Sequence, residues 1–131
     1  MVLKIALKAG ERIAINGAVI VNGDRRSSLV IENQARVLRE RDIIQPEDAN
    51  TPAKRIYVPI MMMYLDPHMR EDMQPEYERR LMEFAGVLSN PEALATCASI
   101  NAYVANSEYY KALAACRKLI DFEKTRLPDV A

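Results

Sequence analysis

The sequence predicts an α+β fold: a small antiparallel β-barrel or sandwich of about five to six short strands, followed by a bundle of about three to four helices. Up to residue 58 apolar and polar residues alternate with the period of a strand, and two Asn-Gly dipeptides interrupt this half. From residue 59 onward the apolar spacing becomes helical. The 131 residues are expected to form one compact unit from two parts, 1–58 and 59–131.

The strand half begins with Leu3–Lys8, where Leu3, Ile5 and Leu7 face one way and Lys4 and Lys8 the other, and Gly10 ends the run. Asn16-Gly17 suits a type I′ hairpin because both of its positions tolerate a positive φ. Asn22-Gly23 opens a second, polar turn that continues through Arg25-Arg26. These signals predict strands at Leu3–Lys8, Ile13–Ile15, Ala18–Val21, Leu29–Ile31 and within Ala35–Asp42.

Prolines mark the predicted boundaries in the middle of the chain. Gln45–Pro52 is acidic and turn-prone and is expected to be a connecting loop. Arg55–Ile60 (RIYVPI) predicts one more strand, which Pro59 ends or confines to a sheet edge because proline has no N–H for a ladder. Met61–Leu65 is then expected to start a helix that Pro67 interrupts.

Three further helix starts are predicted in the second half. Pro75 suits a first helical position, with an acidic residue after it at the positive end of the helix dipole. Asn90-Pro91-Glu92 combines an N-cap, a first-position proline and a first-turn acid. Ser107-Glu108 is expected to start the last helix, on which one apolar stripe contains Tyr109, Leu113, Cys116 and Ile120.

The sulfur-containing residues favour core positions. Cys97 and Cys116 lie among alanines and leucines and are expected to be reduced core thiols. The run Met61–Met63 favours gap filling in a core, although flexible thioethers also suit a protein interface, and the sequence leaves both readings open. Lys4 and Lys8 interrupt the apolar N-terminus, and no apolar run is long enough for a membrane helix, so a cytoplasmic location is expected.

Enzymatic chemistry finds little support in the sequence. The four glycines form neither a phosphate loop nor a G-x-G-x-x-G turn. His68 is the single histidine and is expected on the surface, which removes the usual zinc sets and the Ser/His/Asp and Cys/His nucleophile systems. We therefore expect a protein that is not an enzyme and that needs no cofactor and no metal.

The net charge of zero conceals two halves of opposite sign. Residues 1–58 contain ten Lys or Arg against seven Asp or Glu, and residues 59–131 contain eight against eleven. Guanidinium groups bind phosphate bidentately and stack on unpaired bases, which suits RNA. The same residues also suit the solvated face of a sheet, and charge counts alone favour that simpler interpretation. The basic residues in question are Lys4, Arg25, Arg26, Arg36, Arg39 and Arg41.

Two long segments resemble the FlbT family of alphaproteobacteria: GERIAINGAVIVNGDRRSSLVIENQARVLRERDI (Gly10–Ile43) and TPAKRIYVPIMMMYLD (Thr51–Asp66). The resemblance implies a post-transcriptional regulator that binds the 5′ untranslated region of flagellin mRNA and promotes its decay, opposite a second small regulator, FlaF. It implies no cofactor and no nuclease activity. It also makes RNA binding the favoured role of the basic residues, through Arg39, Arg41, Arg36, the Arg25-Arg26 turn and Lys4.

The strand half is also similar, more weakly, to the RNA-binding regulator CsrA, whose strands end in a V-x-R-E-E-I-like segment. That similarity implies that Arg39 and Lys4, on neighbouring strands, contact RNA loops, although the intervening lengths differ. The alternative is a protein-binding adaptor or chaperone-like partner that contacts flagellin or a FlaF-like regulator through the acidic helices and acts on mRNA only indirectly. The sequence leaves open whether the chain forms a homo-oligomer through an open sheet edge.

Overall fold

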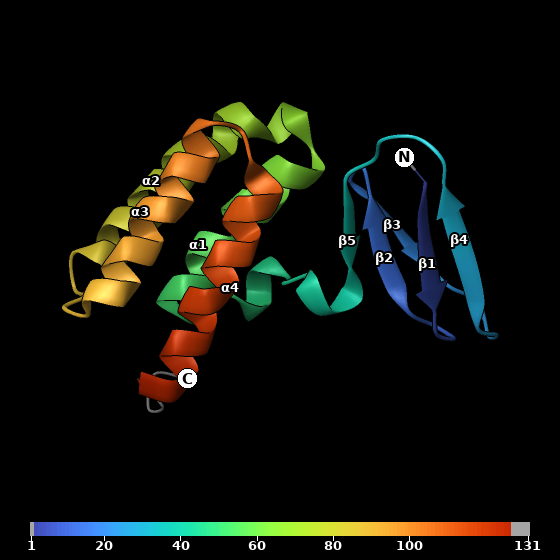
Figure 1. The fold of residues 1–131 in the computed structure, drawn as a ribbon, viewed down its shortest axis with the longest axis horizontal. Helices are drawn as coiled ribbons and strands as arrows, with labels where there is room; N and C mark the ends of the chain where they lie inside the picture. Colours follow the sequence, from blue (N-terminus) through green and yellow to red (C-terminus); the bar gives the residue numbers. More distant parts are fainter. Residues whose placement is uncertain (1, 127–131) are drawn as a thin grey trace. The chain divides into compact units, whose positions relative to one another are not determined.

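The computed structural model describes residues 2–126 and confirms the α+β class (Figure 1). In this range the strands are β1 (Leu3–Leu7), β2 (Arg12–Ile15), β3 (Ala18–Val21), β4 (Ser27–Ile31) and β5 (Val37–Arg39). The helices are α1 (Pro52–Leu65), α2 (Arg70–Ala85), α3 (Pro91–Ala105) and α4 (Tyr109–Arg126). Short 3-10 turns are η1 (Glu40–Asp42), η2 (Pro46–Asp48) and η3 (Pro67–Met69). The chain divides into two compact units, Met1–Ile43 and Ile44–Ala131, called here the strand unit and the helix unit.

The strand unit contains two antiparallel sheets. β1 pairs with β4, and a second sheet has the strand order β3-β2-β5. Apolar residues from both sheets form one core, so the predicted sandwich is the arrangement found and its two sheets do not close into a barrel. The core consists of Ile5, Leu7 and Ile13, with Ile15, Leu29, Ile31 and Val37 packed against it.

The hairpin between β2 and β3 turns at Asn16-Gly17, as predicted. The φ angles are 52° at Asn16 and 90° at Gly17, the positive pair that a type I′ turn requires. The Asn16 side chain also accepts a hydrogen bond from the backbone N–H of Arg36 at 2.9 Å. The backbone N–H of Asn16 donates to the Arg36 carbonyl at 2.8 Å. Asn16 therefore holds the chain before β5 against the hairpin.

Arg55–Ile60 is not a strand, because it lies inside α1. Thr51 caps this helix by accepting a hydrogen bond from the Lys54 N–H at 3.3 Å, and Pro52 occupies the first position. Eight residues of α1 are buried because the helix packs against both α2 and α4. An apolar run that is buried on all sides has no period, so its sequence does not distinguish a strand from a central helix.

The predicted division of the chain changes with this correction. The boundary between residues 58 and 59 falls in the middle of α1, and the structure instead divides the chain after Ile43.

A second correction concerns Pro75, which lies inside α2 and not at its start. α1 ends at Leu65 before Pro67, as predicted, but the turn η3 leads directly into a helix that begins at Arg70.

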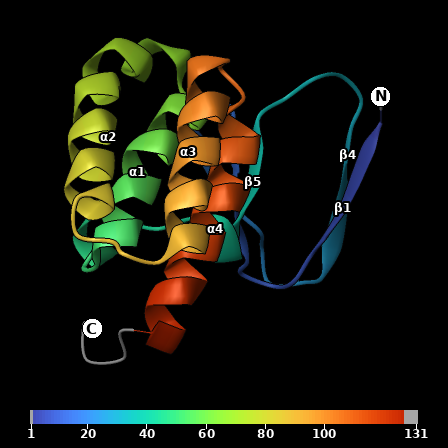
Figure 2. The same ribbon diagram turned by 60° about the vertical axis from the view of Figure 1, so that its left-hand side comes forward.

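The last two helices follow the prediction closely. The Asn90 side chain caps α3 by accepting a hydrogen bond from the Ala93 N–H at 3.0 Å. The predicted stripe on α4 is buried, and Figure 2 shows the four helices lying side by side. Cys97 and Cys116 are free and buried, and burial raises the pKa of both thiols. None of the helices within residues 2–126 combines the length and hydropathy of a membrane span.

Candidate functional site

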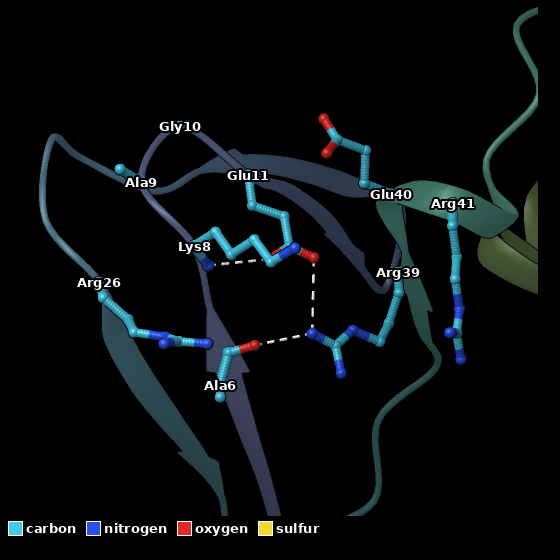
Figure 3. Close-up of a pocket in the computed structure, with 9 residues that line it drawn as sticks. All are labelled: Ala6, Lys8, Ala9, Gly10, Glu11, Arg26, Arg39, Glu40 and Arg41. Carbon is cyan, nitrogen blue, oxygen red and sulfur yellow. Dashed lines mark hydrogen bonds and ion pairs between the residues drawn. The ribbon is translucent and has the colours of Figure 1, made fainter.

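The strand unit contains a pocket of about 590 Å³ that gathers side chains from several of its elements (Figure 3). Four of the lining side chains are cations and two are carboxylates. Ammonium and guanidinium groups around one pocket are the groups that bind anions such as phosphate and carboxylate. The lining residues are Ala6, Lys8, Ala9, Gly10, Glu11, Arg26, Arg39, Glu40 and Arg41.

One wall of the pocket is the turn that follows β1. The Glu11 N–H donates to the Lys8 carbonyl at 3.1 Å, and the Glu11 carboxylate accepts a hydrogen bond from the Lys8 N–H at 2.8 Å. Gly10 has a φ of 70°, a conformation that favours glycine. Its N–H donates to the Gly23 carbonyl at 2.8 Å, which ties this turn to the second one.

Asn22 fixes the turn that carries Arg26. Its side-chain amide donates to the carbonyls of Lys8 at 2.7 Å and Arg25 at 2.9 Å. Its amide oxygen accepts a hydrogen bond from the Ser27 hydroxyl at 2.7 Å. The two Asn-Gly dipeptides thus have different roles, because Asn16 forms a hairpin and Asn22 holds Arg26 beside Lys8.

Arg39 connects the two sheets at the pocket. Its Nη2 donates to the Ala6 carbonyl of β1 at 2.7 Å and lies 3.4 Å from a carboxylate oxygen of Glu11. The side chain remains 40% exposed and is still accessible to a ligand. The sequence-based hypothesis implies that Arg39→Ala weakens RNA binding without altering thermal stability. These contacts indicate instead that the substitution also loosens the strand unit.

The side chains of Lys8, Arg26 and Arg41 make fewer bonds to the protein than that of Arg39. Arg26 is exposed, and its guanidinium has no hydrogen-bond or ion-pair partner within residues 2–126. The Arg41 side chain is 83% exposed, with its Nε 3.9 Å from a carboxylate oxygen of Asp42. Figure 3 shows Arg26 and Arg39 reaching toward Ala6 from opposite sides. Arg26 and Arg41 are therefore the arginines of the pocket most available to an anion, and the exposed Lys8 ammonium is available with them.

The structure brings together only part of the predicted set. Arg26, Arg39 and Arg41 line the pocket, whereas Lys4, Arg25 and Arg36 do not. The predicted set lacks Lys8, Glu11 and Glu40, which do line it. Lys8 directly follows β1 and precedes the turn at Gly10. This position at the end of a strand is the feature of the sequence that could have predicted Lys8 as a site residue.

Glu11 is expected to make the stability of the strand unit depend on pH. The hydrogen bond from the Lys8 N–H lowers the pKa of Glu11 below its ordinary value, and the charge of Arg39 acts in the same direction. A carboxylate with a lowered pKa in the folded state stabilises the fold above its unfolded pKa, and this stabilisation is lost as the pH falls. We expect Glu11→Gln to reduce the melting temperature most near neutral pH, with the difference from wild type shrinking below about pH 4.5.

Thermal unfolding of both proteins from neutral to acidic pH measures this difference. Glu40→Gln is the matched control, because Glu40 is an exposed carboxylate of the same pocket, and it should change stability little. A difference between Glu11→Gln and wild type that stays constant as the pH falls would contradict the role assigned to Glu11.

The described residues contain no group of three or more His, Cys, Asp or Glu side chains arranged to hold a metal ion. The pocket presents cations that bind phosphate oxygens and carboxylates that accept hydrogen bonds from amino groups. Together, the fold and the pocket define a small α+β protein with a cation-lined pocket in its strand unit.

The chain belongs to the FlbT family, because the family model described as flagellar protein FlbT matches residues 3–127. It is 52% identical over 131 residues to the flagellum biosynthesis repressor protein FlbT of Caulobacter vibrioides, covering all of this chain and 93% of that protein. It is 37% identical over 126 residues to a probable repressor of the same name from Bradyrhizobium diazoefficiens, covering 95% of this chain and 84% of that protein. No solved structure matches the chain. The predicted resemblance is confirmed, and the similarity to CsrA stays a prediction.

Proposed function

We propose that this chain is a post-transcriptional regulator of flagellum synthesis that binds the 5′ untranslated region of flagellin mRNA through the pocket of the strand unit. Binding promotes degradation of the message and so represses flagellin synthesis in the cytoplasm. The observation that supports this proposal most directly is the meeting of Lys8, Arg26, Arg39 and Arg41 at one hollow. The relatives support a role in flagellum synthesis, since they are named flagellum biosynthesis repressors.

The charge distribution supports an RNA ligand of a particular kind. The strand unit has eight basic and five acidic residues, and the helix unit has ten and thirteen, so the whole chain has no net attraction for polyanions. Recognition therefore depends on local geometry. Sequence-specific recognition of RNA mostly uses unpaired bases in loops and single strands, where guanidinium planes stack on bases and donate to phosphates. Glu40 adds an exposed acceptor for the amino group of a base.

Replacing Arg26 and Arg41 together by alanine should weaken binding to a flagellin leader transcript at least tenfold, because both side chains are exposed and lightly bonded. Each phosphate contact that is lost should also lower the log–log salt slope by about 0.7. Fluorescence polarisation with a labelled leader RNA at two salt concentrations measures both quantities. Melting temperatures should stay close to wild type.

Arg12→Ala is the matched control, since Arg12 is an exposed arginine of β2 that does not line the pocket. It should leave the affinity and the salt slope nearly unchanged. Arg25→Ala distinguishes the contributions of the two arginines in this turn, because Arg26 lines the pocket and Arg25 does not. Equal losses for Arg12→Ala and for the double variant would show that charge alone, and not this pocket, governs binding.

A second candidate function rests on a separate feature of the helix unit. An apolar groove of about 400 Å³ lies along α2 and α3, and Met82 at its edge is 73% exposed. Such a groove suits an adaptor that binds flagellin or a FlaF-like regulator and acts on mRNA indirectly. In a gel shift, purified chain alone retards the leader transcript under the RNA-binding proposal. Retardation only after a protein partner is added supports the adaptor. The groove residues are Glu78, Leu81, Met82, Ala85, Leu94, Cys97, Ala98 and Asn101.

A further inference from the structure

Strand β3 is an open edge of its sheet and carries more exposed apolar surface than any other strand described. It is the terminal strand in the order β3-β2-β5, and all four of its residues are exposed. Val19 is 59% exposed, Ile20 41% and Val21 53%. Because neighbouring side chains of a strand point to opposite faces, β3 is uncovered on both faces as well as along its edge.

The pairing of β2 with β3 shows which backbone groups of β3 face outward. Ala18 lies opposite Ile15 and Ile20 opposite Ile13, and in the same register the N–H of Asn22 donates to the Glu11 carbonyl at 2.8 Å. Hydrogen-bonded and non-hydrogen-bonded pairs alternate along an antiparallel ladder. Val19 and Val21 therefore direct their N–H and C=O groups away from β2, into the open edge.

We propose that β3 pairs with β3 of a second copy of this chain, antiparallel and about a two-fold axis at Ile20. Residues that form a hydrogen-bonded pair must both present outward groups, so Val19 of one copy pairs with Val21 of the other, and Val21 with Val19. The axis then places the two Ile20 side chains opposite each other. The product is a continuous sheet with the strand order β5-β2-β3-β3-β2-β5.

The chemistry of β3 fits a second copy because the strand is complementary to itself. A two-fold axis brings equal charges face to face, and Ala18–Val21 carries no charge. In the antiparallel arrangement the charged turn at residues 24–26 of one copy lies toward the uncharged Asn16-Gly17 turn of the other. Monomeric proteins usually protect an open edge with lysine, proline or a bulge, and Ala18–Val21 contains neither lysine nor proline.

The two strands of the other sheet, β1 and β4, fit this role less well. β1 carries Lys4, and β4 begins with two serines and turns Leu29 and Ile31 toward the core. β4 exposes one large apolar side chain, Val30, which is 56% exposed. Val30 is therefore a matched control position, because it offers a similar apolar residue with similar exposure on a different edge.

A charge exchange at Ile20 tests the pairing. Sedimentation equilibrium of the full chain from ~1 µM to ~100 µM should show a reversible dimer, since a single strand pair is a small interface. Ile20→Lys alone and Ile20→Glu alone should each raise the dissociation constant at least tenfold, because like charges would meet at the axis. An equimolar mixture of the two variants should dimerise again. Val30→Lys should dimerise like wild type.

Amide hydrogen exchange on the wild-type chain gives a readout that does not depend on how well the variants fold. The N–H groups of Val19 and Val21 should exchange more slowly at high protein concentration, and the Val30 N–H should show no such change. A chain that stays monomeric over this range overturns the proposal. So does a dimer that Val30→Lys disrupts and Ile20→Lys does not, because another edge would then form the interface.

Discussion

Glu123→Ala is expected to destabilise the helix unit by about 2–4 kcal/mol, because it removes a buried carboxylate that holds the start of the central helix. Glu123 lies on α4 and is 4% exposed. One carboxylate oxygen accepts a hydrogen bond from the Thr51 hydroxyl at 2.6 Å, and the other accepts one from the Ala53 N–H at 3.0 Å. The negative charge also lies at the positive end of the α1 dipole.

The loss of stability is large because alanine leaves two buried donors without an acceptor. A buried donor without an acceptor lowers the free energy of unfolding more than the removal of that donor does. Chemical denaturation followed by helical circular dichroism measures the loss. Glu123→Gln keeps one carbonyl acceptor and should lose about half as much stability. Asp121→Ala is the matched control on the exposed side of the same helix and should change stability by less than about 0.5 kcal/mol. Equal losses for Glu123→Ala and Asp121→Ala would refute the capping role.

The five strands before residue 43 and the start of α3 could be predicted because they depend on local signals. The Asn16-Gly17 turn and the Asn90 cap act through backbone groups a few residues away, and both were found where the sequence places them. The identity of α1 could not be predicted in this way. Arg55–Ile60 is a helix because α2 and α4 pack against it and because Glu123, far along the chain, accepts the Ala53 N–H in the first turn of α1.

The same distinction applies to the candidate site. The abundance of arginine in the strand unit predicts Arg26, Arg39 and Arg41, but charge counts contain no information on which arginines meet. Their meeting depends on hydrogen bonds between turns that are distant in sequence, such as the bond from Gly10 to Gly23. For this reason the sequence also groups Lys4, Arg25 and Arg36 with the site and leaves out Glu11.

Asn22→Ala should weaken RNA binding at least as much as the loss of a pocket arginine, although Asn22 does not line the pocket. Its side chain makes short hydrogen bonds to Lys8, Arg25 and Ser27, which fix one turn against the other. Alanine removes all of them and frees the turn that carries Arg26. We therefore expect a loss of about 1–3 kcal/mol in stability together with at least a tenfold loss of affinity for the leader transcript.

Asn33→Ala distinguishes this role from a general effect of removing an asparagine, since Asn33 is exposed in the loop between β4 and β5. It should leave stability and affinity close to wild type.

The decisive comparison combines Asn22→Ala with Arg26→Ala in a double-mutant cycle. If Asn22 acts by positioning Arg26, the effects of the two substitutions on RNA affinity will be less than additive. Full additivity would mean that Asn22 contributes to binding independently of Arg26, and the positioning role would have to be abandoned.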